Sequence, residues 1–307
     1  MGDILIQDTT LTEIADAIRE RNKKIGKIKV SNMADEIRER RLELLPLTDW
    51  SYWFAGGRRT DTVDYIDTSN GTNFESMFSG SGDSFNAGSS MYAAVQKLNT
   101  SNGTDFTSMF ERCQNLERLP TPIFDTSKVI RFTNCFYQCF NLSKAPDFNT
   151  SSCKYFDYMF YDCRRLTNGG VIDMRNIDND YTSLAAQYMF AYCPAITKLK
   201  LIVNGILSSN MYRMFYLSSQ TDAFTDLEIE CTVDENGVKH GIKVDSNDLN
   251  FAYHKNLSVE SLLSILNALE DNANEETKYI VYLGSSNLGR LTAGQKQIAY
   301  NKNLDLR

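Results

Sequence analysis

The sequence is poor in the features that mark enzymes, membrane proteins and nucleic-acid-binding proteins. It has only two histidines, His240 and His254, and no apolar run approaches the roughly 20 residues that a membrane-spanning helix needs. A formal net charge of −7 argues against general nucleic-acid binding, which relies on a cationic surface. The N-terminal segment, MGDILIQDTTLTE, lacks a basic stretch followed by an apolar one, so we expect no secretory signal. We therefore expect neither membrane insertion nor nucleic-acid binding.

The seven cysteines are an odd number, and their positions follow a repeated pattern rather than a disulfide framework. Four of them stand three residues after a phenylalanine, in the pairs Phe110 and Cys113, Phe136 and Cys139, Phe160 and Cys163, and Phe190 and Cys193. In the next two copies of the pattern the same slot holds Ser218 and His254. A slot that accepts Cys, Ser or His is not an obligatory bridge, so we expect small buried thiols in a reducing setting.

What the sequence does have is a phrase of about 25 residues that recurs along its middle. The clearest copies are NTSNGTDFTSMFERCQNLERLP (Asn99 to Pro120), DTSKVIRFTNCFYQCFNLSKAP (Asp125 to Pro146) and NTSSCKYFDYMFYDCRRLTNGG (Asn149 to Gly170). A period of this length predicts a solenoid, in which each repeat buries its apolar face on its neighbours. An extended array of this kind has no deep, unique cleft of the sort that catalysis usually needs.

Each repeat predicts one short strand and one helical turn, and hence an α/β fold. A turn such as NTSNGT comes first, a helical turn such as DFTSMFERC then points Phe, Met and Cys inward, and a stretch such as NLERLP or AITKLKL supplies a strand. We expect the stacked strands to form a parallel sheet on one face, with the helical turns on the other. The regular anchors should form ladders down the core of the repeats: Phe110, Cys113, Phe136, Cys139, Phe160, Cys163, Phe190 and Cys193.

The repeats are predicted to span residues 67–257, with two different segments before them. Residues 1–45 form a separate helical module with a capping box at Thr10–Glu13, which either caps the repeats or serves attachment or oligomerisation. Residues 46–66 form an aromatic-rich cap that contains Trp50 and Trp53. These tryptophans either cover the first repeat or stack on a sugar.

Residues 258–307 are predicted to close the other end of the repeats with a helix, a strand and a second helix. Ser258–Glu270 has the apolar spacing of an amphipathic helix, and KYIVYLG, at Lys278–Gly284, reads as a strand. Thr292–Gln295 opens the last short helix. Terminal segments of a repeat array must cover its open end, which is the role expected here.

No constellation of residues predicts catalysis, a cofactor or a metal site. A His–Cys pair would need an exposed thiol in an electropositive setting, whereas the repeat cysteines are expected to be buried. No CxxC pair supports zinc binding. The segments Asp178–Asp180 and Gly80–Asp83 are similar to calcium or phosphate loops but lack the remaining ligands or glycines. Nothing in the spacing of the carboxylates selects a glycosidase pair, so we expect a protein that is not an enzyme.

The repeat phrase closely resembles the leucine-rich-repeat variant of BspA-like bacterial surface proteins. The resemblance rests on an Asx-Thr-Ser turn followed by Met-Phe, Cys and Leu, as in TSNGTDFTSMFERCQNLERL, and it covers about Asp67 to Leu257. It implies a curved leucine-rich-repeat solenoid and a role in adhesion to cells, matrix or other proteins. Unlike members of that family, this sequence shows no signal peptide and no wall or lipid anchor.

Both ends of the chain resemble phage proteins. LTEIADAIRERNKKIGKIKVSNMADEIRER is similar to the N-terminal helical segment of many phage tail and baseplate-associated proteins. YLGSSNLGRLTAGQKQIAYNKNLDL is similar to the ends of phage-encoded leucine-rich-repeat proteins. Together they imply a virion component that is made in the bacterial host cytoplasm and released by lysis, which needs no secretion signal.

The first functional hypothesis is therefore a tail-fibre or baseplate-associated receptor-binding protein of a phage. Residues 1–45 would dock on other virion proteins or form a homo-oligomer, and the repeats would contact a host cell-surface protein or glycan. The alternatives are a purely structural virion component, such as a head fibre, decoration or assembly protein, and a bacterial leucine-rich-repeat adhesin. The candidate ligand contacts are strand-face residues and the two tryptophans: Glu117, Arg118, Lys144, Lys198, Lys200, Trp50 and Trp53.

Overall fold

The computed structural model describes residues 48–57, 67–81, 89–119, 124–180, 185–217, 222–245, 249–272 and 276–307. The chain divides into two units, Met1–Leu45 and Pro46–Arg307. The helical module predicted for residues 1–45 lies outside the described residues, as do several residues of the predicted aromatic-rich cap, namely 46, 47 and 58–66.

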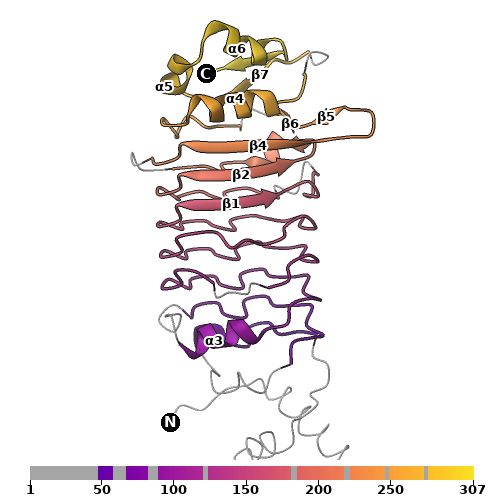
Figure 1. The fold of residues 1–307 in the computed structure, drawn as a ribbon, viewed down its shortest axis with the longest axis vertical. Coiled ribbons are helices and arrows are strands. Elements are labelled where there is room, and N and C mark those ends of the chain that lie inside the picture. Colours follow the sequence, from indigo (N-terminus) through magenta and orange to yellow (C-terminus); the bar gives the residue numbers. More distant parts are fainter. Residues whose placement is uncertain are drawn as a thin grey trace, which may run out of the picture. The chain divides into compact units, whose positions relative to one another are not determined.

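The described part of the chain is mixed α/β, with few helices and small sheets (Figure 1). One sheet has the strand order β1-β2-β4-β5, in which β1, β2 and β4 run parallel and β5 is antiparallel to β4. Two pairs of short parallel strands are β3 with β6 and β7 with β8. No helix among the described residues is long and apolar enough to cross a lipid bilayer. The elements are η1 (Ala55–Gly57), α3 (Ser90–Lys97), β1 (Asn168–Asp173), β2 (Lys198–Val203), β3 (Ile206–Leu207), η4 (Ser208–Met211), β4 (Asp226–Val233), β5 (Lys239–His240), β6 (Ile242–Lys243), α4 (Val259–Ala268), β7 (Tyr279–Val281), α5 (Ser285–Arg290), α6 (Ala293–Tyr300) and β8 (Leu304–Leu306).

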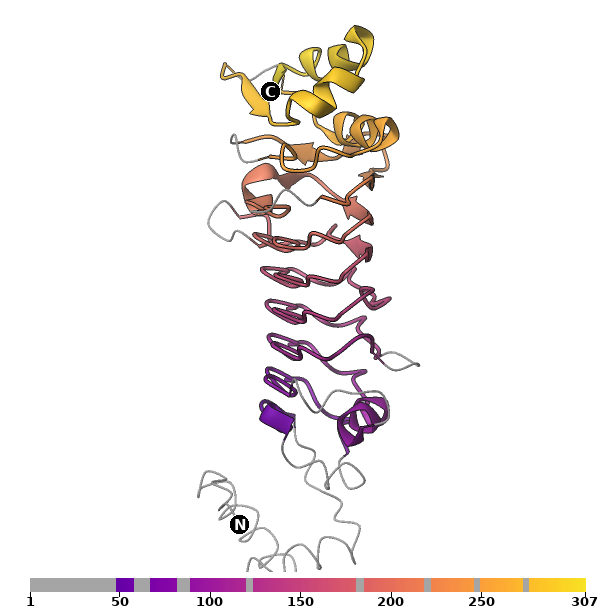
Figure 2. The same cartoon turned by 90° about the vertical axis from the view of Figure 1, so that its left-hand side faces the viewer.

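Successive repeats lie on top of one another along the second unit. Parallel single-residue bridges join Asp49, Asn73, Asp105, Arg131 and Tyr155 in turn, and the β1-β2-β4 ladder continues in the same parallel sense. Figure 2 shows the loops that contain the phenylalanines on one side of this stack and the arrows of β1, β2 and β4 on the other. We call these two faces the loop side and the strand side.

The predicted leucine-rich-repeat solenoid, with one short strand and one helical turn in every repeat, is wrong. The segment DFTSMFERC, Asp105 to Cys113, contains no helix, and NLERL, Asn115 to Leu119, contains no strand. Among the described repeats, only those that contain β1, β2 and β4 supply a parallel strand to the main sheet, and β5 joins it as an antiparallel strand. The others meet their neighbours through turns and single-residue bridges, which leaves few helices and small sheets.

The phenylalanine-containing loops consist of consecutive turns rather than a helix. In the loop from Phe106 to Cys113, alternate N–H groups donate to the carbonyl three residues earlier, as Met109 does to Phe106 at 3.2 Å. The N–H groups between them donate to the next repeat instead, as Phe110 does to Cys135 at 2.9 Å. Every second amide therefore bonds along the stack, and an α-helix, whose hydrogen bonds all stay within the segment, does not form.

In the loops from Phe54 to Phe190, this alternation holds two residues in the left-handed backbone region, two positions before and two positions after the central phenylalanine. In the loop of Phe110 they are Ser108 (φ 53°) and Arg112 (φ 57°). Such geometry costs a non-glycine residue roughly 1–2 kcal/mol, so the hydrogen bonds to neighbouring repeats must maintain it. The equivalent pairs are Tyr52 and Gly56, Ser76 and Gly80, Asn134 and Gln138, Tyr158 and Asp162, and Tyr188 and Tyr192.

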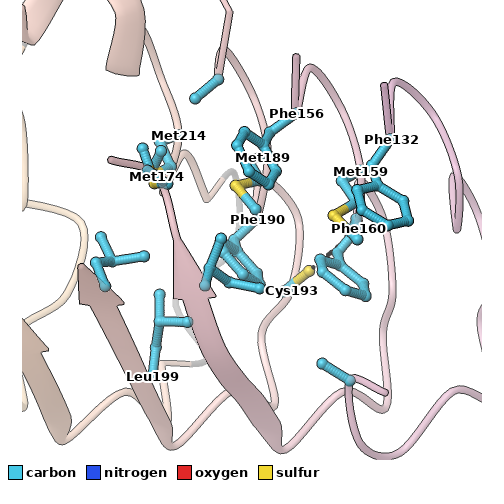
Figure 3. Packing of buried hydrophobic residues seen from close by; sticks show 14 of the residues in the cluster. Phe132, Phe156, Met159, Phe160, Met174, Met189, Phe190, Cys193, Leu199 and Met214 are labelled. Carbon is cyan, nitrogen blue, oxygen red and sulfur yellow. Dashed lines mark hydrogen bonds between the residues drawn. The ribbon is translucent and has the colours of Figure 1, made fainter. Parts of the chain in front are cut away.

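The central phenylalanines of the loops form a ladder through the core. The ring centroids of Phe110 and Phe136 lie 5.3 Å apart, those of Phe136 and Phe160 lie 5.4 Å apart, and both pairs are nearly parallel. Figure 3 shows Phe190 continuing the column beyond Phe160, with the sulfur of Cys193 beside the two rings. Burying one such ring contributes about 1.5–3 kcal/mol, and each aromatic pair adds about 0.5–1.5 kcal/mol.

The side chain three residues after each central phenylalanine serves as a hydrogen-bond donor. The Sγ of Cys139 lies 3.0 Å from the carbonyl oxygen of Phe110 in the preceding repeat. A buried carbonyl without a partner costs about 1–3 kcal/mol, so the slot requires a donor rather than sulfur as such. Ser218, another expected occupant of this slot, lies outside the described residues. The same contact, with distances of 2.8–3.1 Å, is made by Ser81, Cys113, Cys163, Cys193 and His254.

The cysteines are expected to differ sharply in reactivity. All seven are free, and only Cys231 is not fully buried. Burial raises the pKa of Cys193 to about 12, so the reactive thiolate is scarce. We expect the folded protein to react with the thiol reagent DTNB first at Cys231, and at the other six cysteines only when guanidinium unfolds it. The fast phase should vanish in Cys231→Ser, and rapid reaction of a second thiol in the folded protein would contradict the burial.

The C-terminal segment covers the last repeat with the predicted helix, strand and helix, and also contains α5 and β8, which the sequence did not predict (Figure 1). Helix α4 follows Ser258, whose side chain accepts a hydrogen bond from the N–H of Ser261, and the helix packs on β4. Helix α6 begins with a reciprocal capping box between Thr292 and Gln295. The helix predicted after Ser258, the strand that became β7 and the last short helix are thus confirmed.

Candidate functional site

An open groove of about 610 Å³ lies on the strand side, where β1, β2 and β4 meet the start of α4. Small-ligand sites in proteins occupy about 300–1,000 Å³, so the groove is large enough for a ligand of several rings or residues. Its lining is rich in charged and hydroxyl side chains. These are Lys144, Asp147, Lys198, Lys200, Asp226, Glu228, Ser258, Glu260, Ser261 and Ser264.

The parallel register places one column of polar side chains across the groove. Lys144 is paired with Asn168, Asn168 with Lys198, and Lys198 with Asp226, each in the neighbouring repeat. Adjacent strands lie about 4.7–4.9 Å apart, so these residues stand in a close row. We call this row, Lys144, Asn168, Lys198 and Asp226, the groove column.

A bulge at the start of β1 shapes the floor of the groove. The register between β1 and β2 shifts between Asn168 and Val171, and Gly170 has a φ of 74°. A Cβ at Gly169 would lie 2.8 Å from Cδ1 of Leu199, closer than real contacts allow. The two adjacent glycines are therefore required by the bulge and by its close approach to β2.

A ladder of hydroxyl groups fixes the backbone beside the groove column. The Oγ1 of Thr167 donates to the carbonyl of Ser143 at 2.9 Å, that of Thr197 to Thr167 at 2.8 Å, and that of Thr225 to Thr197 at 3.2 Å. Each of these residues immediately precedes a member of the groove column. The column is therefore presented from backbone that is hydrogen-bonded to both neighbouring repeats.

Two of the three lysines that line the groove are already paired with carboxylates. The Nζ of Lys200 lies 2.7 Å from Glu228 and 2.7 Å from Glu230, and hydrogen bonds to these two carboxylates raise its pKa. The Nζ of Lys144 lies 2.9 Å from Asp147. Exposed pairs of this kind contribute only about 0–1 kcal/mol, so a ligand can displace them at little cost.

Lys198 differs from these two lysines. It is exposed, and among the residues that the structure describes it makes no ion pair. Asp226 and Glu260, which also line the groove, are exposed as well. The groove thus offers an available ammonium group and available carboxylates, whereas the hydroxyls of Ser261 and Ser264 are already bonded to the backbone of β4 and the residue before it. This chemistry suits a polar ligand with many hydroxyl groups or with charges of both signs.

The structure brings three of the predicted contact residues into one groove. Lys144, Lys198 and Lys200 all line it. Glu117 and Arg118 are exposed but do not line it. The carbonyl of Glu117 accepts a hydrogen bond from the N–H that precedes Lys144, at 3.1 Å, so these two residues continue the strand side by one repeat.

The two tryptophans occupy the first loop of the stack. Trp50 is fully buried, and its ring packs edge-on against that of Trp53 with centroids 5.0 Å apart. A Cβ at Gly71 would lie 2.9 Å from Trp50, which shows how closely the next repeat covers it. The predicted sugar-stacking role is therefore wrong for Trp50, because sugar stacking needs a free ring face. Trp53 is half-buried and packs against the same core.

His254, which the sequence places in the cysteine slot, is buried beside the carboxylate of Asp222. Its Nδ1 lies 2.9 Å from Asp222 and its Nε2 lies 2.8 Å from the carbonyl of Phe215. Both ring nitrogens therefore lie within hydrogen-bonding distance of an oxygen atom. Burial alone would raise the pKa of Asp222, but hydrogen bonding to His254 lowers it below its usual value. The pair serves the packing of the last loops.

Sequence reasoning missed a set of tyrosines on the loop side. We call Tyr137, Tyr158, Tyr161, Tyr188, Tyr192, Tyr212, Tyr216 and Tyr253 the tyrosine strip; their rings form one connected series of contacts. Most of them stand two residues before, or one or two residues after, a central phenylalanine. That fixed offset is the sequence signal that could have found them.

These features define a repeat protein whose loops bond along a stack and whose strand side carries a polar groove. A family model described as "Mycoplasma protein of unknown function, DUF285" matches residues 48–172 and 83–200. The chain is therefore similar to that family from the first loop of the stack to β2. No curated protein and no solved structure matches the chain.

Proposed function

We propose that this chain is a phage virion protein, tail-fibre or baseplate-associated, that binds the host cell surface through the strand-side groove. The observation that carries the proposal is the groove column, in which the exposed Lys198 stands between Asn168 and Asp226. The resemblance of both chain ends to phage proteins supports the virion part. Residues 1–45 would attach the chain to other virion proteins.

The groove supports a host cell-surface glycan or protein segment as the ligand. Its open form and mixed charges favour a chain-like polar molecule that lies along the strand side. A groove of this kind forms few contacts per ligand, so the affinity of one chain is expected to be modest. Several copies on one particle would raise the overall affinity through multivalency.

Replacing Lys198 with glutamate is expected to weaken binding to host cells about tenfold, the effect of losing one charge-assisted contact of about 1.4 kcal/mol. The measurement is saturation binding of the labelled full-length chain to a panel of candidate bacteria, with unlabelled chain as competitor. Lys255→Glu is the control, because Lys255 is exposed and lies outside the groove. If both variants bind a strain as tightly as the wild type does, the groove is not the receptor-binding site.

The virion part of the proposal needs a separate measurement, which is detection of the chain in purified phage particles by mass spectrometry. A chain that is present in particles but binds no host strain would be a purely structural virion component. A chain that binds cells but is absent from particles would be a bacterial adhesin. Both results would contradict the proposal in different ways.

A further inference from the structure

The tyrosine strip is a continuous aromatic surface on the loop side. It spans the repeats of Phe136, Phe160, Phe190, Phe215 and Phe251, with neighbouring ring centroids 4.9–5.7 Å apart along the series. The rings are half-buried, and Tyr253 at the last repeat is 38% exposed. Such contiguous aromatic surface is uncommon away from interaction sites.

The rings lie so that they present edges and hydroxyl groups rather than faces. Tyr137 stacks on Tyr161 with an interplanar angle of 5°, and Tyr158 stacks on Tyr188 with the same angle. Each ring therefore uses at least part of its face on a neighbour in the stack. A sugar ring needs a free aromatic face, whereas tyrosine edges with hydroxyls are typical of protein–protein contacts.

The fold itself does not require tyrosine at these positions. Tyr158, Tyr188 and Tyr192 adopt left-handed φ values of 53–59°, which are unfavourable for a bulky side chain. The position of Tyr158 and Tyr188 is occupied by Ser108 and Asn134 in the earlier repeats, with the same backbone geometry. The tyrosines thus gather at one end of the loop side for a reason other than loop geometry.

The charges on the loop side differ between the two ends of the stack. At the C-terminal end, the guanidinium of Arg213 lies 5.1 Å from the ring of Tyr212 and 5.3 Å from that of Tyr216, and donates to the hydroxyl of Tyr188 at 3.0 Å. It is exposed and, among the described residues, has no carboxylate partner. Toward the N-terminal end, Glu111 has only a loose contact with the neighbouring Arg112, at 3.6 Å.

We propose that the tyrosine strip is a self-association surface, on which a second copy of this chain packs antiparallel, loop side against loop side. Arg213 lies two repeats after the repeat of Phe160, and Glu111 lies two repeats before it. A two-fold axis at the repeat of Phe160, perpendicular to the stack, therefore sets Arg213 of each copy against Glu111 of the other. Tyr161 lies at the centre of this interface.

The lateral positions of the two charges fit this arrangement. Under such an axis, Arg213 faces the equivalent position of the opposite repeat, which is that of Ser108. Glu111 stands three residues after Ser108 in that loop. Tyr158 and Tyr161 occupy the same two positions in the loop of Phe160. Their ring centroids lie 5.6 Å apart, so side chains at these two positions are neighbours. An arginine side chain can span that offset. Because the two copies are related by a two-fold axis, the contact between Arg213 and Glu111 occurs twice in each dimer.

Figure 2 shows the loops on one side of the stack and the strands β1, β2 and β4, whose residues line the groove, on the other. A dimer that pairs loop sides therefore leaves both grooves open, and they face away from each other. The inference stands on Arg213, Glu111 and the tyrosines, and does not depend on the ligand of the groove.

The test is sedimentation equilibrium of the full-length chain and its charge variants from about 1 to about 100 µM. The wild type is expected to dimerise within this range. Arg213→Glu is expected to raise the dimer Kd at least about tenfold, because it places two glutamates opposite each other. The double variant Glu111→Arg with Arg213→Glu is expected to return the Kd to within about threefold of the wild type. Lys296→Glu, on α6, is the matched control and should leave the Kd unchanged.

Thermal unfolding of every variant shows whether the fold is intact, which separates loss of association from loss of structure. A wild type that stays monomeric throughout the range overturns the proposal. So does an oligomer whose Kd is unchanged by Arg213→Glu, since another surface then holds it together. A double variant whose dimer Kd is as high as that of Arg213→Glu alone also overturns the antiparallel pairing.

Discussion

Phe136→Ala is expected to lower the free energy of unfolding by about 3–5 kcal/mol, the usual cost of truncating a fully buried phenylalanine. Phe136 has no exposed surface, and its ring stacks on Phe110 at 5.3 Å and on Phe160 at 5.4 Å. Its removal leaves a cavity between two repeats and deprives both neighbouring rings of a partner. The cavity cannot close easily, because hydrogen bonds along the stack fix the distance between repeats.

Equilibrium unfolding in urea measures this loss. Phe140→Ala is the matched control, since Phe140 is only partly buried and is covered by the guanidinium of Arg164 at 4.2 Å. It is expected to cost about 1 kcal/mol or less. Equal losses in the two variants would show that the ladder of stacked phenylalanines is not the main source of stability.

Gly241→Ala is expected to destabilise the protein by more than about 3 kcal/mol, because backbone stands where the new methyl group would lie. A Cβ at Gly241 would be 1.9 Å from the carbonyl oxygen of Ala268, at the end of α4. The glycine cannot move away freely. Its N–H donates to Glu270 at 2.9 Å, and its carbonyl accepts from Ile206 at 3.0 Å.

The contrast with a second glycine makes this result specific. Gly289 lies in α5, and a Cβ there meets nothing within 4 Å. Gly289→Ala is therefore expected to stabilise the protein by about 0.5–1 kcal/mol through its effect on helix formation. Thermal and urea unfolding of both variants provide the comparison. If Gly241→Ala were as stable as the wild type, the close approach of α4 to the segment between β5 and β6 would be wrong.

The capped helices could be predicted from the sequence because their signals are local. Ser258 precedes α4 and accepts a hydrogen bond from the N–H of Ser261, and Thr292 and Gln295 form a reciprocal box at the start of α6. A capping side chain acts within one turn of backbone, so a short window of sequence contains all the information needed. The strand predicted in AITKLKL is β2. It could be recognised because the alternation of apolar and charged residues is also a local signal.

The structure of the loops could not be predicted from such a window. Phe106, Met109, Phe110 and Cys113 have the spacing of an amphipathic helix, and consecutive turns point the same residues inward. What decides between the two is the partner of every second amide, which lies in the next repeat about 25 residues away. Local periodicity carries no information about that partner, so the expected helical turn and the expected solenoid were wrong.

The candidate site could be predicted only in part. Alternation of charged and apolar residues identified Lys144, Lys198 and Lys200 as outward-facing, but the groove itself depends on the register of β1 and β2 and on the bulge at Gly169 and Gly170. The tyrosine strip was present as a fixed offset from the phenylalanines. Its significance emerges only once stacking brings rings that are about 25 residues apart into contact.

The direction of the hydrogen bonds between loops has a mechanical consequence. These bonds run from one repeat to the next, so tension applied to the two ends of the stack acts along them rather than across them. Such loading opens repeats one after another from an end instead of shearing many at once. The 24 residues from Phe136 to Phe160 would extend by roughly 80 Å when their repeat detaches. The stack would thus lengthen in steps under load while the repeats still in place keep their structure.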